Sequence, residues 1–192
     1  MARSDDLKKH LRKGSVYRRN DLTRWSKSID RHLEALVQDG TLQKLSQGMY
    51  YVPENSSFGN VPPMEEVLVR SFLKDDRFLL TSPNAYNSLK VGTTQLYNQR
   101  TVYNHKRHGI FKLGNRNFHF RIKPHFPKKV TEEFLLVDLV NNLETLDEDH
   151  AMVLKNISLK AGTMDAKKLV HAVSEYGNAK TKKIFTQLIH QS

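Results

Sequence analysis

Between Ser26 and Gly40 the apolar residues recur at i, i+4, i+7 and i+8, the spacing that places them on one face of a helix. Ser26 is suited to cap the N-terminus of this helix, and Gly40 follows the last apolar residue as a stop signal. The apolar face consists of Ile29, Leu33, Leu36 and Val37. The opposite face carries Lys27, Ser28 and Arg31. The pattern predicts an amphipathic helix with two cations on its polar side.

The pattern changes to that of a hairpin directly after Gly40. Leu42 and Leu45 lead into Ser46-Gln47-Gly48, and Met49–Val52 is rich in strand-forming residues. A tight hairpin turn needs a residue that accepts positive φ, and Gly48 does so without steric cost. We therefore expect two short antiparallel strands that meet at Gly48.

Two shorter helices are expected before the amphipathic one. Asp5–Lys13 places Leu7 and Leu11 at i and i+4, and Asn20–Trp25 offers one or two turns behind an Asn cap. Three helices followed by a hairpin are the elements of a winged helix-turn-helix. In such modules the third helix enters the DNA major groove and its first residues touch base edges.

The rest of the chain alternates between connecting, strand-like and helical patterns. Residues 53–63 contain three prolines with Ser, Asn and Gly, as a linker does. Phe118, Phe120 and Ile122 alternate with polar residues, as in a half-buried strand. Strands are expected at Phe78–Leu80, Thr101–Tyr103, Ile110–Leu113 and Asn117–Ile122, and helices at Met64–Lys74, Glu132–Leu143, Glu148–Leu159, Asp165–Tyr176 and Asn178–Ile189.

These elements predict an α+β protein of two domains. A winged helix-turn-helix would occupy residues 1–52, residues 53–63 would be a linker, and residues 64–192 would form a mixed domain with a small β-sheet and a helical C-terminal part.

Composition narrows the class of partner. The 192 residues include 31 Lys or Arg against 20 Asp or Glu, a formal net charge of +11. Such an excess favours a polyanion, either nucleic acid or an anionic membrane surface. No apolar run reaches the ~20 residues that span a bilayer, and the N-terminus is too charged for a signal peptide. We expect a soluble cytoplasmic protein that does not act at a membrane.

The candidate DNA contacts gather around the third helix and the hairpin. Arg binds guanine through two hydrogen bonds, and Lys or Ser reaches phosphates or base edges. The competing interpretations are a solvated helix face for the helix residues, general solubility for the pair before the second helix, and a plain turn for the hairpin. The candidates are Arg18, Arg19, Arg24, Lys27, Ser28, Arg31, Lys44 and Gln47.

A second basic segment follows at residues 100–129, which hold nine Lys or Arg, four His and no acid. It would be a second nucleic-acid surface, a docking face for an acidic or RNA-bound partner, or a solvated sheet face. The next segment, residues 130–150, holds seven acids and no Lys or Arg. The candidates for the second basic surface are Arg100, Lys106, Arg107, Lys112, Arg116, Arg121 and Lys123.

The sequence offers little support for catalysis. Cys is absent, so thiolate ligands and a Cys nucleophile are excluded. His105, His108, His119 and His125 lack a carboxylate or Cys at ligand spacing, and surface histidines are the better interpretation. Five acids lie at expected helix starts, where the helix dipole explains them better than paired-carboxylate catalysis does: Glu132, Glu133, Asp147, Glu148 and Asp149. We expect no enzyme, metal or cofactor.

One further stretch resembles a known family. In Leu80–Tyr103, the residues Ala85, Tyr86, Leu89, Gly92, Thr93, Thr94, Gln95 and Val102 resemble the AbiEi-like antitoxins of type IV toxin–antitoxin systems. In these proteins an Ala and an aromatic residue lead through a small helix to a Gly-x-Thr-Thr-Gln-like turn and then a strand. The N-terminal set Leu33, Leu36, Gly40, Leu45, Gly48 and Tyr50 is similar to that family as well.

The resemblance implies an N-terminal winged helix that represses its own operon at inverted repeats, as a free monomer that pairs on DNA. It also implies a C-terminal domain that counters a nucleotidyltransferase-type toxin, without requiring direct contact. From the residues themselves, the Thr93-Thr94-Gln95 stretch is expected to organise a loop by hydrogen bonds with the backbone. Two alternatives stay open: a solitary winged-helix regulator, or a module that docks protein or RNA.

Overall fold

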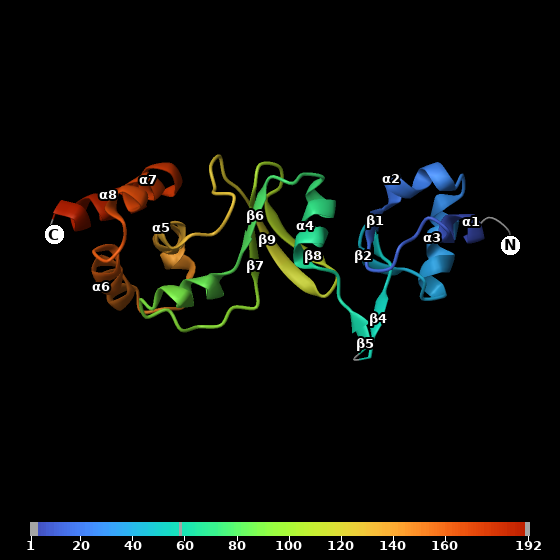
Figure 1. The fold of residues 1–192 in the computed structure, drawn as a ribbon, viewed down its shortest axis with the longest axis horizontal. Helices are drawn as coiled ribbons and strands as arrows, with labels where there is room; N and C mark the ends of the chain where they lie inside the picture. The colour runs from blue at the N-terminus through green and yellow to red at the C-terminus, as the bar shows by residue number, and fades with distance from the viewer. Residues whose placement is uncertain (1–3, 58, 191–192) are drawn as a thin grey trace. The chain divides into compact units, whose positions relative to one another are not determined.

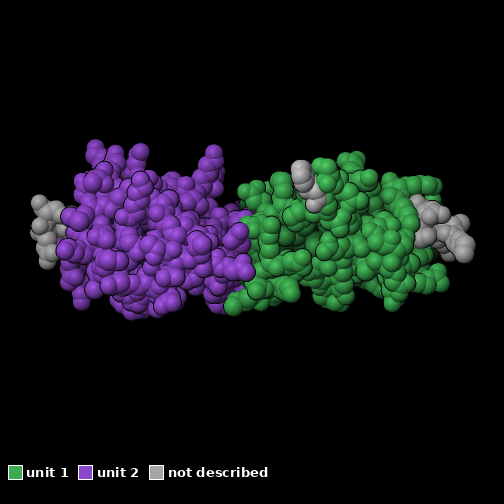
Figure 2. Space-filling view, turned by 90° about the horizontal axis from the view of Figure 1, so that it is seen from below, with its two compact units in different colours: residues 1–76, 110–118 green, residues 77–109, 119–192 purple. Residues whose placement is uncertain are grey.

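The computed structural model describes residues 4–57 and 59–190 and has mixed α and β structure (Figure 1). The expected α+β class is confirmed at that level. The chain divides into two compact units (Figure 2). The first unit comprises residues 1–76 and 110–118, and the second comprises residues 77–109 and 119–192. The first unit therefore extends beyond the expected 1–52 domain.

The first part of the chain folds into short helices and a small sheet. Its strands have the order β1-β3-β2, with both pairings antiparallel. The sequence pattern did not predict β1, because three half-buried residues leave no alternation to detect. The elements are α1 (Ser4–Lys8), β1 (Val16–Arg18), α2 (Arg19–Leu22), the 3-10 helix η1 (Thr23–Trp25), α3 (Ile29–Gln38), β2 (Gln43–Ser46) and β3 (Met49–Tyr51).

The amphipathic pattern defines the core of this part. The buried residues are Leu7, Leu22, Ile29, Leu33, Leu36, Leu42 and Val52, and Leu11, Tyr17, Trp25, Val37 and Tyr50 pack around them. Each buried Leu or Ile removes apolar surface worth about 1.5–3 kcal/mol from water. Helix α3 is therefore stabilised mainly by the burial of its apolar face against this core, and less by the intrinsic helix propensity of its residues.

Two expected caps are wrong. Helix α3 begins at Ile29 after Ser28, and the Ser26 hydroxyl lies 2.8 Å from His32 Nδ1 instead of capping the helix. Helix α2 begins at Arg19 with Arg18 at the cap position, so Asn20 lies inside it. The Ser26 hydroxyl is engaged by His32, and at the start of α2 the Asp21 carboxylate accepts from the backbone N–H of Arg18 over 3.4 Å and so caps the helix earlier than expected.

The expected linker contains structure of its own. Strands β4 (Glu54–Ser56) and β5 (Gly59–Val61) form an antiparallel hairpin within residues 53–63. The Tyr51 hydroxyl donates to the Val61 carbonyl over 2.7 Å. Helix α4 (Glu65–Leu73) follows, as expected from Met64–Lys74, and buries Leu68, Val69 and Leu73.

A four-stranded sheet has the order β6-β7-β9-β8. Strands β6 and β7 pair antiparallel, with Leu79 opposite Tyr103. Phe118 and Phe120 are fully buried, but Ile122 is 53% exposed, so the expected alternation ends before Ile122. The strands are β6 (Phe78–Thr81), β7 (Arg100–Asn104), β8 (Gly109–Leu113) and β9 (Arg116–Ile122).

The C-terminal part is helical, as expected. Helix α5 is apolar on nearly all sides and lies at the centre of the main cluster of buried side chains in the second unit. Side-chain oxygens of Thr131, Asp149 and Asp165 cap α5, α6 and α7. The elements are the 3-10 helices η2 (Pro83–Leu89) and η3 (Leu143–Thr145), and the helices α5 (Glu132–Asn142), α6 (His150–Ala161), α7 (Ala166–Tyr176) and α8 (Ala179–His190).

Candidate nucleic-acid interface

Two cations without an ion pair among the described residues lie at the start of α3: Arg31 in its first turn, and Lys27 just before the helix. Lys27, Ser28 and Arg31 are exposed, while Ile29 and Leu33 are buried on the opposite face. Within the described parts of the chain, neither Lys27 nor Arg31 forms an ion pair. Their charge is therefore available to an external anion, as the sequence pattern predicted.

The turn between β2 and β3 exposes further polar side chains. Gly48 occupies the turn with φ +69°, the conformation for which glycine was expected here. Lys44 and Gln47 are exposed, and Leu45 and Met49 are buried beneath them. A register shift between Lys44 and Ser46 marks a bulge in β2. The β2–β3 hairpin thus offers to solvent one cation, Lys44 of β2, and one amide, Gln47 of the turn.

Arg18 and Arg19 differ from these cations because each is held by a carboxylate. Arg18 donates to Asp21 over 3.1 and 3.2 Å. Arg19 donates through Nε and Nη2 to the two oxygens of Asp30 over 2.6 and 2.7 Å. The hydrogen bond from Arg19 lowers the pKa of Asp30, and the same bond raises the pKa of Arg19. Each guanidinium group already has an anionic partner inside the protein.

Arg24 lies over the ring of Trp25, with Cζ 4.0 Å from the ring centroid. His10 stacks on the same indole at 4.5 Å with an interplanar angle of 6°. This stacking makes Trp25 a packing residue between η1 and the segment that follows α1. Arg24 is exposed, so the contact leaves its side chain accessible to solvent.

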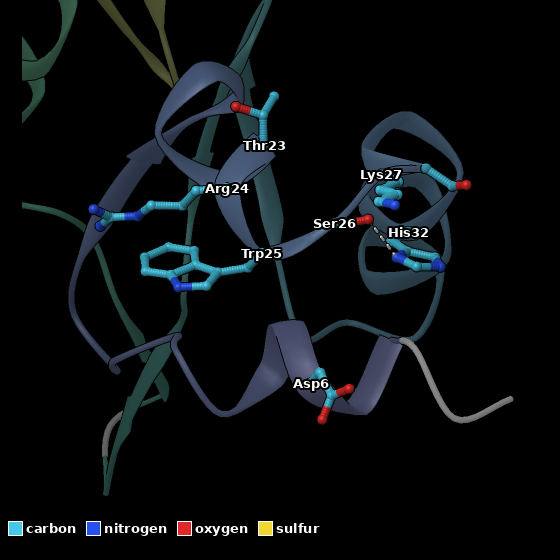
Figure 3. A pocket seen from close by; sticks show the side chains of 8 residues that line it. Asp6, Thr23, Arg24, Trp25, Ser26, Lys27 and His32 are labelled. Carbon is cyan, nitrogen blue, oxygen red and sulfur yellow. Dashed lines mark hydrogen bonds between the residues drawn. The ribbon is translucent and has the colours of Figure 1, made fainter.

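An open pocket of about 380 Å³ lies where η1 leads into α3 (Figure 3). Two cations and three hydroxyl groups line it together with one acid, Asp6, which pairs with Lys9 at 2.9 Å. Cations and hydroxyl donors beside the start of a helix suit an anion such as a phosphate. The lining residues are Asp6, Thr23, Arg24, Trp25, Ser26, Lys27, Ser28 and His32.

The second basic set is divided by its internal contacts. Arg116 binds Glu65 at 2.9 Å, Lys123 binds Asp138 at 2.9 Å, and Arg121 donates to Asn142. Lys112 and Arg116 belong to the first unit, whereas Arg100, Lys106, Arg107, Arg121 and Lys123 belong to the second. Arg100, Lys106 and Arg107 also have interactions within the protein, which weakens the interpretation of a single free basic surface.

A buried polar cluster in the second unit was not predicted. The Asp138 carboxylate is fully buried in α5 and accepts hydrogen bonds of 2.8 Å from the hydroxyls of Tyr86 and Tyr103. Asn142 donates to both hydroxyls over 3.2 Å. Burial and the negative charge of Asp138 raise the pKa of each tyrosine well above 10. The sequence signal is a lone acid inside the apolar run of residues 134–140.

Three histidines of the basic segment, His105, His108 and His119, have aromatic neighbours. His105 stacks on Phe126 at 4.8 Å, and His108 meets His119 edge to face at 6.4 Å. Burial lowers the pKa of His119, with help from the charges of Arg121 and His108. In the described ranges no three His, Asp or Glu residues gather as metal ligands would. No helix there is both long and apolar enough to cross a bilayer.

The residues that carry the family resemblance are largely structural. Tyr86, Leu89 and Val102 are buried, and Gly92 has φ +94°. The loop that follows is held by backbone amides, because Thr94 and Gln95 each donate over 3.1 Å to the Glu148 carboxylate. No family model, curated protein or solved structure matches the chain. The resemblance therefore stays a prediction.

Proposed function

We propose that the first unit is a winged helix that binds duplex DNA, with α3 in the major groove and the β2–β3 turn against the flanking backbone. The observation that carries the proposal is the exposed start of α3, where Lys27 and Arg31 have no ion pair within the described residues. Arg31 is the candidate base reader, since its guanidinium group matches the two acceptors of guanine. Lys27 and the pocket beside it are the candidate phosphate contact.

The two exposed acids of α3, Asp30 and Glu34, are compatible with DNA binding by this helix. Asp30 faces solvent in the first turn of α3 and would repel phosphates, but Arg19 neutralises it. Glu34 is exposed one turn further along. A carboxylate at that position suits the amino group of cytosine better than a phosphate. The charge pattern therefore favours sequence-dependent binding over a uniformly cationic surface.

We further propose that the protein is an antitoxin that represses its own operon and counters a nucleotidyltransferase-type toxin. The support is the resemblance of Leu80–Tyr103 and of the N-terminal set to AbiEi-like antitoxins. In this proposal the protein binds an operator with inverted repeats, as a monomer that pairs on DNA, and has no catalytic activity. The second unit supplies the counteracting function by a route that need not involve contact with the toxin.

DNA binding is tested with duplexes that tile the region upstream of the gene. The full chain should bind one duplex well above a scrambled duplex of the same composition. Arg31→Ala should weaken that specific binding by about 1–3 kcal/mol if Arg31 reads a base, and should lower the affinity for both duplexes alike if it holds a phosphate. Binding that does not change in Arg31→Ala removes this residue from the interface, and equal wild-type binding to all duplexes rejects the proposed function.

The antitoxin role is tested by gene neighbourhood and by growth. A reading frame for a nucleotidyltransferase-like protein should lie beside the gene, and its expression alone should stop growth. Co-expression of the full chain should restore growth. Growth arrest that persists with the full chain, or the absence of such a neighbour, leaves a solitary regulator.

A further inference from the structure

We infer that Arg19 is a positioning residue that fixes α3 relative to the β2–β3 turn, rather than a phosphate contact. This inference rests on the proposed function, in which both elements touch DNA. A helix in the groove and a turn on the backbone bind one site together at lower entropic cost when their spacing is fixed before binding. The contacts of Arg19 supply such a constraint.

The side chain of Arg19 is tied to α3. Its Nε and Nη2 atoms meet the two Asp30 oxygens at 2.6 and 2.7 Å, the paired geometry that a planar guanidinium group and a carboxylate favour. Paired bonds constrain orientation as well as distance, so they fix the first turn of α3 relative to the start of α2. A single bond from a lysine would leave this orientation free.

The main chain of Arg19 is tied to the turn. Its N–H donates to the Gly48 carbonyl over 2.9 Å, and the preceding residue, Arg18, lies opposite Met49 in the sheet. A Cβ added to Gly48 would lie 3.9 Å from the Arg19 Cβ, so Arg19 borders the space beside Gly48. One residue therefore bonds the start of α3 with its side chain and the tip of the hairpin with its backbone.

The same geometry limits what Arg19 offers to DNA. Two of its three guanidinium nitrogens are occupied by Asp30, whereas Lys27 and Arg31 have no ion pair among the described residues. A phosphate at Arg19 would have to compete with a carboxylate that is already aligned. Removal of the Asp30 charge therefore distinguishes two roles of Arg19. If Arg19 is a phosphate contact, its guanidinium group becomes free and DNA binding becomes stronger. If Arg19 is a positioning residue, α3 loses its fixed orientation and specific binding becomes weaker.

The test is a double-mutant cycle in the full chain, with Arg19→Gln, Asp30→Asn and the combined variant. The readouts are the affinity for the preferred duplex and for a scrambled duplex, each as a function of salt. Each single variant should weaken specific binding by about fivefold, and the combined variant should be no weaker than either. The salt dependence should stay at the wild-type slope. Arg70→Gln removes a comparable exposed pair, with Asp76, and is the matched control.

Two results would overturn the inference. One is tighter DNA binding by Asp30→Asn, and the other is a salt slope that falls by about one in Arg19→Gln, as the loss of a phosphate contact requires. Amide hydrogen exchange of the variants without DNA separates this inference from the proposed function. Exchange at the start of α3 and in the turn should accelerate in both variants even if the wild type binds no DNA. Unchanged exchange in both variants rejects the positioning role.

Discussion

Cationic side chains in the first unit fall into two groups according to what they contact. Arg18 and Arg19 are bound to Asp21 and Asp30, whereas Lys27 and Arg31 face solvent without an ion pair within the described chain. A helical wheel places such residues on one face but cannot show which acid reaches which cation across elements. Arg19 and Asp30 are eleven positions apart and on different helices, so their pairing is a property of the fold.

Lys27 provides a test of the phosphate contact. Lys27→Ala should weaken binding to all duplexes by a similar factor, about twofold to fivefold, and should reduce the salt slope by about 0.9, because a phosphate contact carries no sequence information. Lys155→Ala, an exposed lysine on α6, is the matched control. A loss confined to the preferred duplex would instead assign Lys27 to a base edge.

Gly48 provides a second test, in the turn. Gly48→Ala places a side chain at φ +69°, which costs about 1 kcal/mol in the left-handed region although its nearest neighbour is an ordinary 3.9 Å away. We expect lower stability and weaker specific binding, measured by denaturant unfolding and titration with DNA. Gly40→Ala has a similar φ of +76° and open space around it, so it should cost similar stability without affecting DNA binding. Equal losses of DNA binding in both variants would contradict a role for the turn.

Secondary-structure elements could be predicted where the hydrophobic period was long enough to detect. Helix α3, the β2–β3 hairpin and α5 to α8 follow from the sequence because each buries a regular apolar set. Strands β1 and β4 have three residues each, and Glu54–Ser56 has no buried side chain, so neither has an apolar pattern. Backbone pairing with β3 and β5 forms them, and this pairing is not encoded in local periodicity.

The packing of α5 depends on a buried carboxylate that sequence reasoning did not find. Asp138 joins Tyr86 of η2, Tyr103 of β7 and Lys123, which follows β9, so one side chain connects three segments to the helix. Lys123 also lies 4.0 Å from the Tyr103 ring centroid. Only the fold brings these residues together, because they are separated by 15 to 52 positions.

Removal of this carboxylate should destabilise the second unit strongly. Asp138→Ala leaves two buried hydroxyls and a lysine without their acceptor, and we expect a loss of about 3–5 kcal/mol in the free energy of unfolding. Asp149→Ala, which removes only the cap of α6, should cost about 1 kcal/mol. Denaturant unfolding of both variants measures the difference. Equal losses would mean that the buried cluster contributes no more than a helix cap.

For the chain as a whole, the buried tyrosines predict a limit to stability at alkaline pH. Tyr86 and Tyr103 have pKa values raised well above 10 in the folded protein by burial and by Asp138, whereas in the unfolded chain they titrate near 10. Deprotonation then favours the unfolded state, so stability from this source is complete below pH 10 and falls as pH rises beyond it. Unfolding curves at increasing pH, read with tyrosinate absorbance, test this.

The number of tyrosines that ionise before unfolding distinguishes the buried pair from the other tyrosines. Of the seven tyrosines, Tyr86 and Tyr103 should ionise only when the second unit unfolds. Tyr103→Phe should remove part of the loss of stability above pH 10, although it also removes one hydrogen bond to Asp138. Gradual ionisation of all seven tyrosines before unfolding would contradict the buried cluster.

The proposed DNA-binding surface consists of α3 with the residues before it and the β2–β3 turn. Amide hydrogen exchange of the full chain, with and without a duplex for which it shows preference, tests this most directly. We predict that the largest protection falls on residues 27–35 and 44–49, with little change across residues 100–129 and in α7 and α8. Protection confined to those other segments, with residues 27–35 unchanged, would contradict the account.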